Sequence, residues 1–439
     1  MYTLNTMGLK VEFQVAPLRN DLDTELRLRV GPGFENRRLP PTGETSRMKI
    51  AFVVHDYRRM EGHSRYVVEL ATRFAREHEV HVFANEIDTE GNTDIRFHHV
   101  SAWRPNALVS ILSFAASATW RVRGQFDIIH NQVLCGLRGN VFTAHICNEA
   151  WHRALECASG RLTFREWVSG NTLRILERNV YRFAGKAGII AVSRRIAADL
   201  RNCYHCKAPI SVVYHGVDLQ TFIPADKNPV RAAMRAECGL QPDEMAFLFV
   251  GDMRKGGVQC IRALSRLSEG KLMFVSRTPD EPYRALAGEL GLSGRVLFLG
   301  TTREVQKYYA AADALLLPTH YDSFAMVVTE AMACSLPVVV SREAGASELI
   351  QHGTNGLILE NYRDEAELAG YMRLLTTDRT LAQNLGAAAR HTAEQYSWDE
   401  VAARTMAIYR QVSQTQEAPI PTSRYSRLFN LRQNPPRQR

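Results

Sequence analysis

Residues 318–341 read Pro-Thr-His-Tyr-Asp-Ser-Phe-Ala-Met-Val-Val-Thr-Glu-Ala-Met-Ala-Cys-Ser-Leu-Pro-Val-Val-Val-Ser, and this stretch decides the fold. Four apolar residues, 314–317, precede it and are enough for one buried strand. Pro337 ends the central segment, and the apolar residues 338–340 predict the next buried strand. A strand, a helix and a strand in this order are typical of a parallel sheet, because parallel strands need a crossover connection.

The segment between these strands predicts a helix with an unusual acid. Asp322 and Ser323 are residue types that begin helices, and 324–334 continue without Gly or Pro. Glu330 lies among apolar residues of this helix, where a carboxylate is unfavourable unless something pairs with it. Eight residues of helix correspond to about 12 Å of rise, so the two carboxylates can contact opposite ends of an elongated polar ligand. Alternatively, Asp322 caps the helix and Glu330 pairs with a buried Arg.

Strand and helix patterns recur along the chain in two series. The first has predicted strands at 48–54, 80–84, 95–100, 127–130, 140–145, 188–192 and 210–214, with helices at 64–76 and 194–202. The second has predicted strands at 245–250, 272–275, 296–299, 314–317, 338–340 and 357–359, with helices at 258–267 and 366–376. Alternating strands and helices predict an α/β protein with doubly wound domains.

The composition indicates a globular protein without a strongly basic surface. A length of 439 residues suggests two or three domains, and 45% of the residues are hydrophobic. The net charge is +8, but residues 414–439 hold five Arg and one Glu, and residues 1–47 hold seven basic and six acidic residues. Only +3 remains for the rest of the chain, so we expect no nucleic-acid partner.

The ends of the chain and its cysteines suggest a cytoplasmic protein. Residues 1–47 lack a periodic pattern, and we expect a disordered leader or a start assigned too early, whereas 413–439 predict a disordered basic tail. No apolar run reaches the roughly 18 residues of a membrane span, and no signal-peptide pattern is visible. The eight cysteines lack framework spacing, and Cys203-Tyr-His-Cys206 has no further ligands nearby, so we expect reduced thiols and no metal site.

A glycine-rich turn predicts a phosphate site. Residues 251–257, Gly-Asp-Met-Arg-Lys-Gly-Gly, follow a predicted strand and open a predicted helix. Backbone N–H groups from Gly251 onward, with the cations of Arg254 and Lys255 beside them, suit a diphosphate. Fixed positive groups also stabilise the charge that builds up when a diphosphate leaves. The alternative is a solvated turn with surface cations.

The central stretch resembles the signature of the retaining family 4 glycosyltransferases, which have the GT-B fold. That signature is Glu, seven residues, Glu, then Ala-Met-Ala, Gly and Pro-Val-Val; here Asp322 stands for the first Glu and Ser335 for the Gly. His-Gly-Val-Asp at 215–218 is similar to the family's interdomain junction, and Tyr-Ser-Trp at 396–398 to the start of its terminal helix. The resemblance covers about 48–412.

The resemblance implies two Rossmann-like domains that face a central cleft. The first, 48–218, lies on the acceptor side, and the second, 219–395, holds the nucleotide sugar. A C-terminal helix, 396–412, crosses back to the first domain.

The resemblance also implies roles for single residues. In the family the first acid of the signature contacts the donor sugar and the second contacts the nucleotide ribose. The catalytic residues implied are Asp322, His145, Arg254 and Lys255, and the substrate-binding residues are Gly62, Gly251, Phe324, Glu330 and Gly345. Asn148 and Glu149 are weaker candidates, and Glu348 is as readily explained by a structural role.

His145 ends the predicted strand 140–145, and its imidazole can hold a sugar hydroxyl or stabilise the phosphate. Without the resemblance, a lone histidine at a strand end is more often structural.

The function implied is transfer of a hexose from a nucleotide sugar to a glycan or lipid-linked hydroxyl, with retention of configuration and without a cofactor or metal. Tyr-Asp-x-Phe at 321–324 is similar to the branch that builds lipopolysaccharide cores. Two alternatives stay open: a scaffold that binds sugar nucleotides without efficient turnover, and a sugar-nucleotide epimerase.

A basic stripe suggests a membrane surface as a further partner. Arg174, Arg178, Arg182 and Lys186 recur every four residues and so share a face of a predicted helix. Such a face can dock on an anionic membrane that carries a lipid-linked acceptor. A solvated helix face is the alternative.

Overall fold

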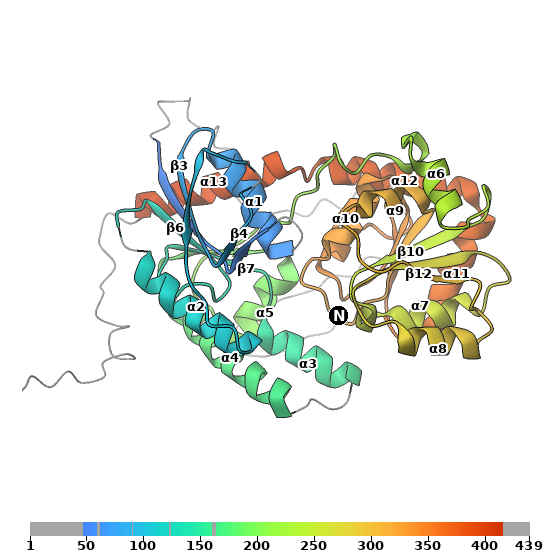
Figure 1. Cartoon of the computed structure of the whole chain (residues 1–439), viewed down its shortest axis with the longest axis horizontal. Coiled ribbons are helices and arrows are strands. Elements are labelled where there is room, and N and C mark those ends of the chain that lie inside the picture. Colours follow the sequence, from blue (N-terminus) through green and yellow to red (C-terminus); the bar gives the residue numbers. More distant parts are fainter. Residues whose placement is uncertain (1–46, 59–61, 90, 123, 160–163, 416–439) are drawn as a thin grey trace, which may run out of the picture. The chain divides into compact units, whose positions relative to one another are not determined.

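Two parallel β-sheets with helices packed against them organise the chain (Figure 1). This computed structural model describes residues 47–58, 62–89, 91–122, 124–159 and 164–415. Apart from Arg47, the expected leader lies outside the described residues, as do residues 416–439 of the expected tail. Residues 413–415 continue the last helix, so the prediction of a tail is wrong for these three.

The first sheet has its strands in the order of a doubly wound domain. In spatial order they are β5 (Ile95–His99), β3 (Glu79–Ala84), β1 (Lys49–Val53), β6 (Ile128–Gln132), β7 (Val141–Ala144), β8 (Gly188–Ala191) and β9 (Ile210–Val212). The chain builds outward from β1 in one direction and then restarts at β6 on the other side. The carboxyl ends of β1 and β6 therefore flank a switch point, where ligands bind in such sheets.

The second sheet repeats this arrangement. Its spatial order is β12 (Val296–Phe298), β11 (Lys271–Val275), β10 (Ala246–Val250), β13 (Ala314–Leu317), β14 (Val338–Ser341) and β15 (Leu357–Leu359). The switch point lies between β10 and β13, which pair in parallel. Both sheets confirm the predicted α/β fold, and the predicted strands agree with the observed ones to within two residues.

The described residues form thirteen α-helices, of which the last three follow the final strand. They are α1 (Gly62–Phe74), α2 (Ala107–Arg121), α3 (Asn148–Ser159), α4 (Phe164–Arg182), α5 (Arg194–Tyr204), α6 (Arg231–Glu237), α7 (Gly257–Leu264), α8 (Glu281–Glu289), α9 (Val305–Ala311), α10 (Met326–Ala333), α11 (Glu365–Thr377), α12 (Arg379–Glu394) and α13 (Trp398–Thr415). Short 3₁₀ helices occupy Ala225–Lys227, Met253–Lys255 and Gly345–Leu349, and β2 (Asp56–Tyr57) pairs with β4 (Glu86–Ile87).

Alternate residues of β1 face two different hydrophobic clusters. Ile50 and Phe52 pack with α1 and α13, whereas Ala51 and Val53 pack with α2. This alternation follows from the two-residue repeat of a strand and explains why the predicted first strand is apolar throughout.

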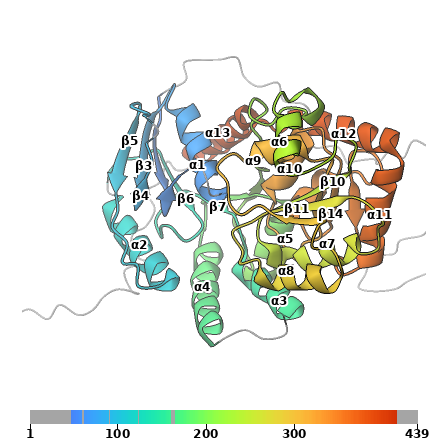
Figure 2. The ribbon, with the colours of Figure 1, turned by 45° about the vertical axis from the view of Figure 1, so that its right-hand side comes forward.

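The last helix returns to the first domain, as expected. Figure 2 shows α13 beside α1, and Trp398 and Tyr409 are buried in the cluster that holds β1. Tyr409 Oη lies 2.6 Å from His130 Nδ1 in β6, so the C-terminal helix is hydrogen-bonded into the first sheet.

The start of α10 differs from its prediction. Asp322 and Ser323 do not begin the helix; α10 starts at Met326, and no side chain caps it. Asp322 forms a bridge with Ala344, and its carbonyl accepts a hydrogen bond from Gly345 N at 2.9 Å. Because these bonds hold the segment extended, the helical spacing assumed between Asp322 and Glu330 is wrong.

The backbone conformation at Ser335 explains why a glycine suits the position after α10. Its φ is 58°, in the left-handed region that L-residues avoid. We expect Ser335→Gly to stabilise the protein by about 1 kcal/mol, since the conformation costs an L-residue roughly 1–2 kcal/mol. A rise of the thermal midpoint would confirm this, and Ser335→Ala, which keeps the strain, is the control. A midpoint lowered by the glycine would contradict it.

Candidate functional site

A cavity of about 400 Å³ lies at the switch point of the second sheet, between the ends of β10 and β13. Both domains contribute to its wall. The predicted site residues that line it are Gly62, His145, Gly251, Lys255, Asp322 and Phe324. The predicted residues Arg254, Glu330 and Gly345 are not among the described residues that line it. We call this the donor cavity.

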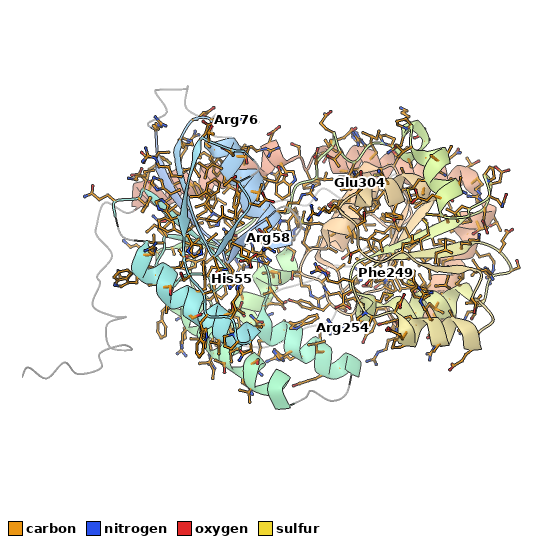
Figure 3. The ribbon with its side chains drawn as sticks, in the orientation of Figure 1. His55, Arg58, Arg76, Phe249, Arg254 and Glu304 are labelled. Atoms are coloured by element: carbon orange, nitrogen blue, oxygen red, sulfur yellow. The ribbon has the colours of Figure 1, made fainter. Side chains whose placement is uncertain are left out.

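Lys255 and Arg254, the two cations of the glycine-rich turn, have different partners and different exposure. Lys255 Nζ lies 2.8 Å from Asp322 Oδ2 in the wall of the donor cavity. The Arg254 side chain is 75% exposed and forms an ion pair with Asp252 at 2.6 Å. Arg254 and Phe249 both come from the second domain, and His55 from the first (Figure 3). Lys255 is therefore the cation of this pair that can reach a bound anion without rearrangement.

The start of α10 is open toward the same cavity. Ala325, Met326 and Val327 line it, and Ala325 has a φ of 70°. A non-glycine residue in this region is uncommon and often marks a functional constraint. The helix has no side-chain cap, and the positive end of its dipole favours an anion here, next to Lys255.

Glu330 has its own partners within the protein. Its Oε1 accepts a hydrogen bond from Arg65 Nη1 of α1 at 2.9 Å, and its Oε2 accepts one from Tyr309 at 3.0 Å. Glu330 is 7% exposed. Glu330 is thus paired with an arginine, as in the structural alternative, although Arg65 is only partly buried. The role of Glu330 toward a ribose stays a prediction.

Gly345 and Glu348 have structural explanations. A Cβ on Gly345 would lie 2.1 Å from the carbonyl oxygen of Ser323, so a glycine is required by the chain itself. The Glu348 carboxylate accepts hydrogen bonds from the N–H groups of Arg194 and Arg195, each at 2.8 Å, and so caps α5 across the interface of the two domains. Ser193, which begins α5, also donates to the Ser323 carbonyl at 2.8 Å.

A second cavity, of about 720 Å³, lies at the switch point of the first sheet. Its wall includes Gln132 and Val133 at the end of β6, and Ile111 of α2. His63, His145 and Ser323 line both cavities, so the two meet at these residues. We call this the acceptor-side cavity. No local sequence pattern indicates this cavity, because its wall comes from seven separate stretches of the chain.

His145 lies where the cavities meet, and its hydrogen bond defines its protonation. Its Nε2 is 2.8 Å from Gln132 Oε1. Since a carbonyl oxygen only accepts, Nε2 donates and Nδ1 is left as an acceptor. Nδ1 is buried and has no partner among the described residues, which suits a ligand hydroxyl.

His215 is a site residue that sequence reasoning missed. Its ring stacks on that of His145 with centroids 5.3 Å apart, it lines the donor cavity, and its buried Nδ1 has no partner among the described residues. Burial lowers its pKa to about 3, and burial with the charges of His215 and His63 lowers the pKa of His145 well below the usual value. The motif at 215–218 was the available signal.

Buried neutral histidines predict a loss of stability in acid. Burial lowers the pKa of His130 and of His215 to about 3, whereas in the unfolded chain each titrates near 6.5. The unfolded state binds more protons below pH 6.5, so stability is full above that pH and falls toward pH 3. Each histidine contributes about 1.4 kcal/mol per pH unit.

Thermal midpoints between pH 8 and pH 5 measure this effect. His215→Asn, which removes one of these buried imidazoles, should flatten the profile, and exposed His205→Asn should not. A midpoint independent of pH in wild type would contradict the prediction.

The remaining candidates divide between the cavity and the surface. Asn148 lines the acceptor-side cavity, whereas Glu149 is paired with Arg174 at 2.6 Å. This pair removes Arg174 from the basic stripe, and Lys186 follows the end of α4 at Arg182. The expectation of four cations on one helix is therefore wrong; Arg178, Arg182 and Lys186 remain exposed.

Metal and membrane signals are absent in the part of the chain that is described. No group of three His, Cys, Asp or Glu is placed to hold a metal ion there, and no helix there has the length and apolar character to cross a bilayer. All eight cysteines are free.

Two family models match the chain, one on each domain. "Glycosyltransferase Family 4" matches residues 60–221, and "Glycosyl transferases group 1" matches residues 230–392. A D-inositol 3-phosphate glycosyltransferase of Xylanimonas cellulosilytica is 31% identical over 249 residues, which are 54% of this chain and 59% of that protein. One of Jonesia denitrificans is 26% identical over 79% of this chain and 90% of its own length. The chain thus spans about three fifths of the length of the Xylanimonas relative.

Solved structures share the two-domain architecture. Sucrose-phosphate synthase from Thermosynechococcus elongatus has a TM-score of 0.71 at 22% identity and covers 84% of this chain and 100% of its own. WaaG, a glycosyltransferase involved in lipopolysaccharide biosynthesis, has a TM-score of 0.70 at 20% identity and covers 82% and 99%. These likenesses confirm the expected GT-B fold.

Proposed function

The chain belongs to the family 4 glycosyltransferases, and on that premise we propose that it transfers a hexose from a nucleotide sugar to an acceptor hydroxyl, with retention of configuration. The observation that supports this most is the meeting of two cavities at His145, one lined by Lys255 and the open end of α10, the other by the first domain. The first suits a sugar diphosphate, and the second leaves room for an acceptor beside it.

The reaction breaks the bond between the anomeric carbon and the diphosphate oxygen. Charge builds up on the departing diphosphate, and Lys255 together with the N–H groups at the start of α10 is placed to stabilise it. The acceptor hydroxyl forms the new bond from the same face, and its proton passes to the leaving phosphate. His145 Nδ1 accepts a hydrogen bond from a sugar hydroxyl and so orients it.

Asp322 is a donor-sugar contact in this proposal. Its carboxylate lines the donor cavity and is held by Lys255 at 2.8 Å. A bound diphosphate competes for Lys255, and Asp322 then becomes available to the sugar hydroxyls. Neither a cofactor nor a resident metal takes part.

Nucleotide-sugar turnover tests the proposal. A panel of nucleotide sugars is first ranked by thermal shift, since a specific donor stabilises the fold by mass action. The best donor is then assayed for release of nucleoside diphosphate, with and without EDTA. Release that survives EDTA supports the proposal. Binding without release would favour the scaffold, a changed sugar without release would favour the epimerase, and rescue by Mn²⁺ after EDTA would overturn the metal-free mechanism.

Location follows from the substrates. We propose that the enzyme works in the cytoplasm, where nucleotide sugars are made, and contacts the inner face of the membrane if its acceptor is lipid-linked. The exposed cations at Arg178, Arg182 and Lys186 lie close to Ile175 and Phe183 in the chain, which are 62% and 56% exposed. Cations beside exposed apolar side chains favour an anionic membrane surface.

Sedimentation with anionic liposomes tests this contact. Each cation near the surface contributes about 1 kcal/mol, so reversing three charges should abolish binding that is already weak. Binding should also fade at 1 M salt, where the Debye length is about 3 Å. The control variant reverses three exposed cations of the second domain, namely Lys227, Arg277 and Arg303. Both variants are compared in chains that end at Thr415, which removes the Arg-rich tail. Binding unaffected by reversal would contradict the contact.

A further inference from the structure

We propose that the acceptor-side cavity binds an acceptor with an apolar aglycone, and that this chain does not use a free phosphorylated inositol. The inference rests on the proposed function, because it assigns the second cavity to the acceptor. A volume of about 720 Å³ is in the range of small-molecule sites. The two cavities share His145, so a ligand there can present a hydroxyl at the donor cavity.

Most of the surface that this cavity's wall exposes is apolar, although polar side chains also line it. Ile111, Val133, Ile146 and Leu173 line it, and each is partly exposed although it packs against the hydrophobic core. Phe114 closes the wall from α2. Apolar side chains left open to a cavity gain free energy when an apolar group covers them, at roughly 25 cal/mol per Å².

The charges of this cavity do not suit a phosphorylated acceptor. Arg104 is the one Lys or Arg among the described residues of the wall. Its Nη2 is 2.6 Å from Asp56 Oδ1, and its Nη1 donates to Glu86. Two carboxylates thus neutralise this cation, and Asp56 itself lines the cavity. Phosphate recognition relies on unpaired Arg, Lys or N–H groups, so among the described residues of the wall a phosphomonoester would meet a carboxylate and no unpaired Lys or Arg.

Backbone strain at Val133 supports the assignment of this cavity as a ligand site. Val133 has a φ of 49°, a region in which a β-branched residue is an outlier. Strained residues of this kind cluster at ligand sites. Val133 N donates a hydrogen bond to the carbonyl of Thr143 at 2.9 Å, which holds this conformation. Thr143 precedes His145 by two residues in the chain.

The test measures by calorimetry how tightly the full chain binds methyl glucoside, hexyl glucoside and inositol 1-phosphate. The alkyl glucosides are used below their critical micelle concentrations. Each buried methylene increases affinity about fourfold, so hexyl glucoside should bind at least tenfold more tightly than methyl glucoside. Inositol 1-phosphate should bind more weakly than hexyl glucoside. Equal affinities for the two glucosides, or tightest binding of inositol 1-phosphate, would overturn the proposal.

Matched variants locate the effect. Leu173→Asn and Ile175→Asn lie on the same helix, but only Leu173 lines the cavity. The first should remove the preference for the hexyl chain and the second should keep it. Val133→Asn serves as a second variant, since Asn tolerates positive φ and the fold should persist. Loss of the preference in Ile175→Asn, or its survival in both cavity variants, would sink the assignment.

A second measurement, nucleotide binding, distinguishes failure of this inference from failure of the proposed function. Nucleoside diphosphate binding is measured in parallel by thermal shift. Hexyl glucoside binding without nucleotide binding would mean that the proposed function fails, whereas nucleotide turnover without a preference for the hexyl chain would reject the apolar acceptor alone.

Discussion

Replacing Lys255 by Ala is expected to lower kcat by about 10²–10³, the loss seen when one preorganised donor to a developing oxyanion is removed. Lys255 Nζ lies in the wall of the donor cavity, and Trp151 lies under it at 5.6 Å from the ring centroid. The charge is therefore already in place before the diphosphate departs. The measurement is kcat for release of nucleoside diphosphate at saturating nucleotide sugar.

Arg254→Ala is the matched control. Its side chain is 75% exposed and bound to Asp252, and it lies outside the described wall of the cavity. We expect its kcat to stay within about tenfold of wild type, because an exposed ion pair contributes little. Equal losses in the two variants would show that the turn rearranges on binding. An unchanged kcat in Lys255→Ala would contradict the leaving-group role.

Replacing Glu330 by Ala is expected to destabilise the protein by about 1–3 kcal/mol, the usual cost of leaving a buried hydrogen-bonding group without its partner. Arg65 would lose this partner and keep the more distant Glu69 carboxylate at 4.0 Å, and the buried Tyr309 hydroxyl would lose an acceptor. Urea unfolding of the nucleotide-free protein measures this effect. Glu330→Gln keeps the shape and both possible hydrogen bonds, and should lose less.

Nucleotide affinity separates the structural role of Glu330 from a ligand role. If Glu330 accepts the ribose hydroxyls, Glu330→Gln should weaken nucleoside diphosphate binding, since a hydrogen bond to a charged group contributes about 1.5–3 kcal/mol. Arg65→Gln, which releases the carboxylate, should not weaken it. Asp322→Ala should instead affect only binding that depends on the sugar. Equal losses of free diphosphate affinity in Asp322→Ala and Glu330→Gln would contradict this division of roles.

Local sequence determined the elements and their order. Short, largely apolar runs bounded by Gly, Pro and polar residues predicted the strands of both sheets, because strands buried on both faces are rich in apolar residues. The turn at 251–257 was also readable, since its glycines, two of them at positive φ, are required by local backbone geometry. These features depend on neighbours along the chain.

Contacts between distant segments decided the site. The start of α10 moved from Asp322 to Met326 because Ala344, some twenty residues later, holds Asp322 in an extended bridge. Local helix-start signals are weak, and tertiary hydrogen bonds of this kind overrule them.

The partners of the buried acids and the two cavities were likewise beyond local sequence. Glu330 pairs with Arg65, which is 265 positions away, and Glu348 caps a helix of the other domain. The acceptor-side cavity exists only where α2, α4 and the ends of β1, β6 and β7 come together. The sequence by itself determined which elements form, because propensity and periodicity act locally. Only the tertiary structure decided which charges meet and where space remains, because those depend on packing between segments that the sequence does not place side by side.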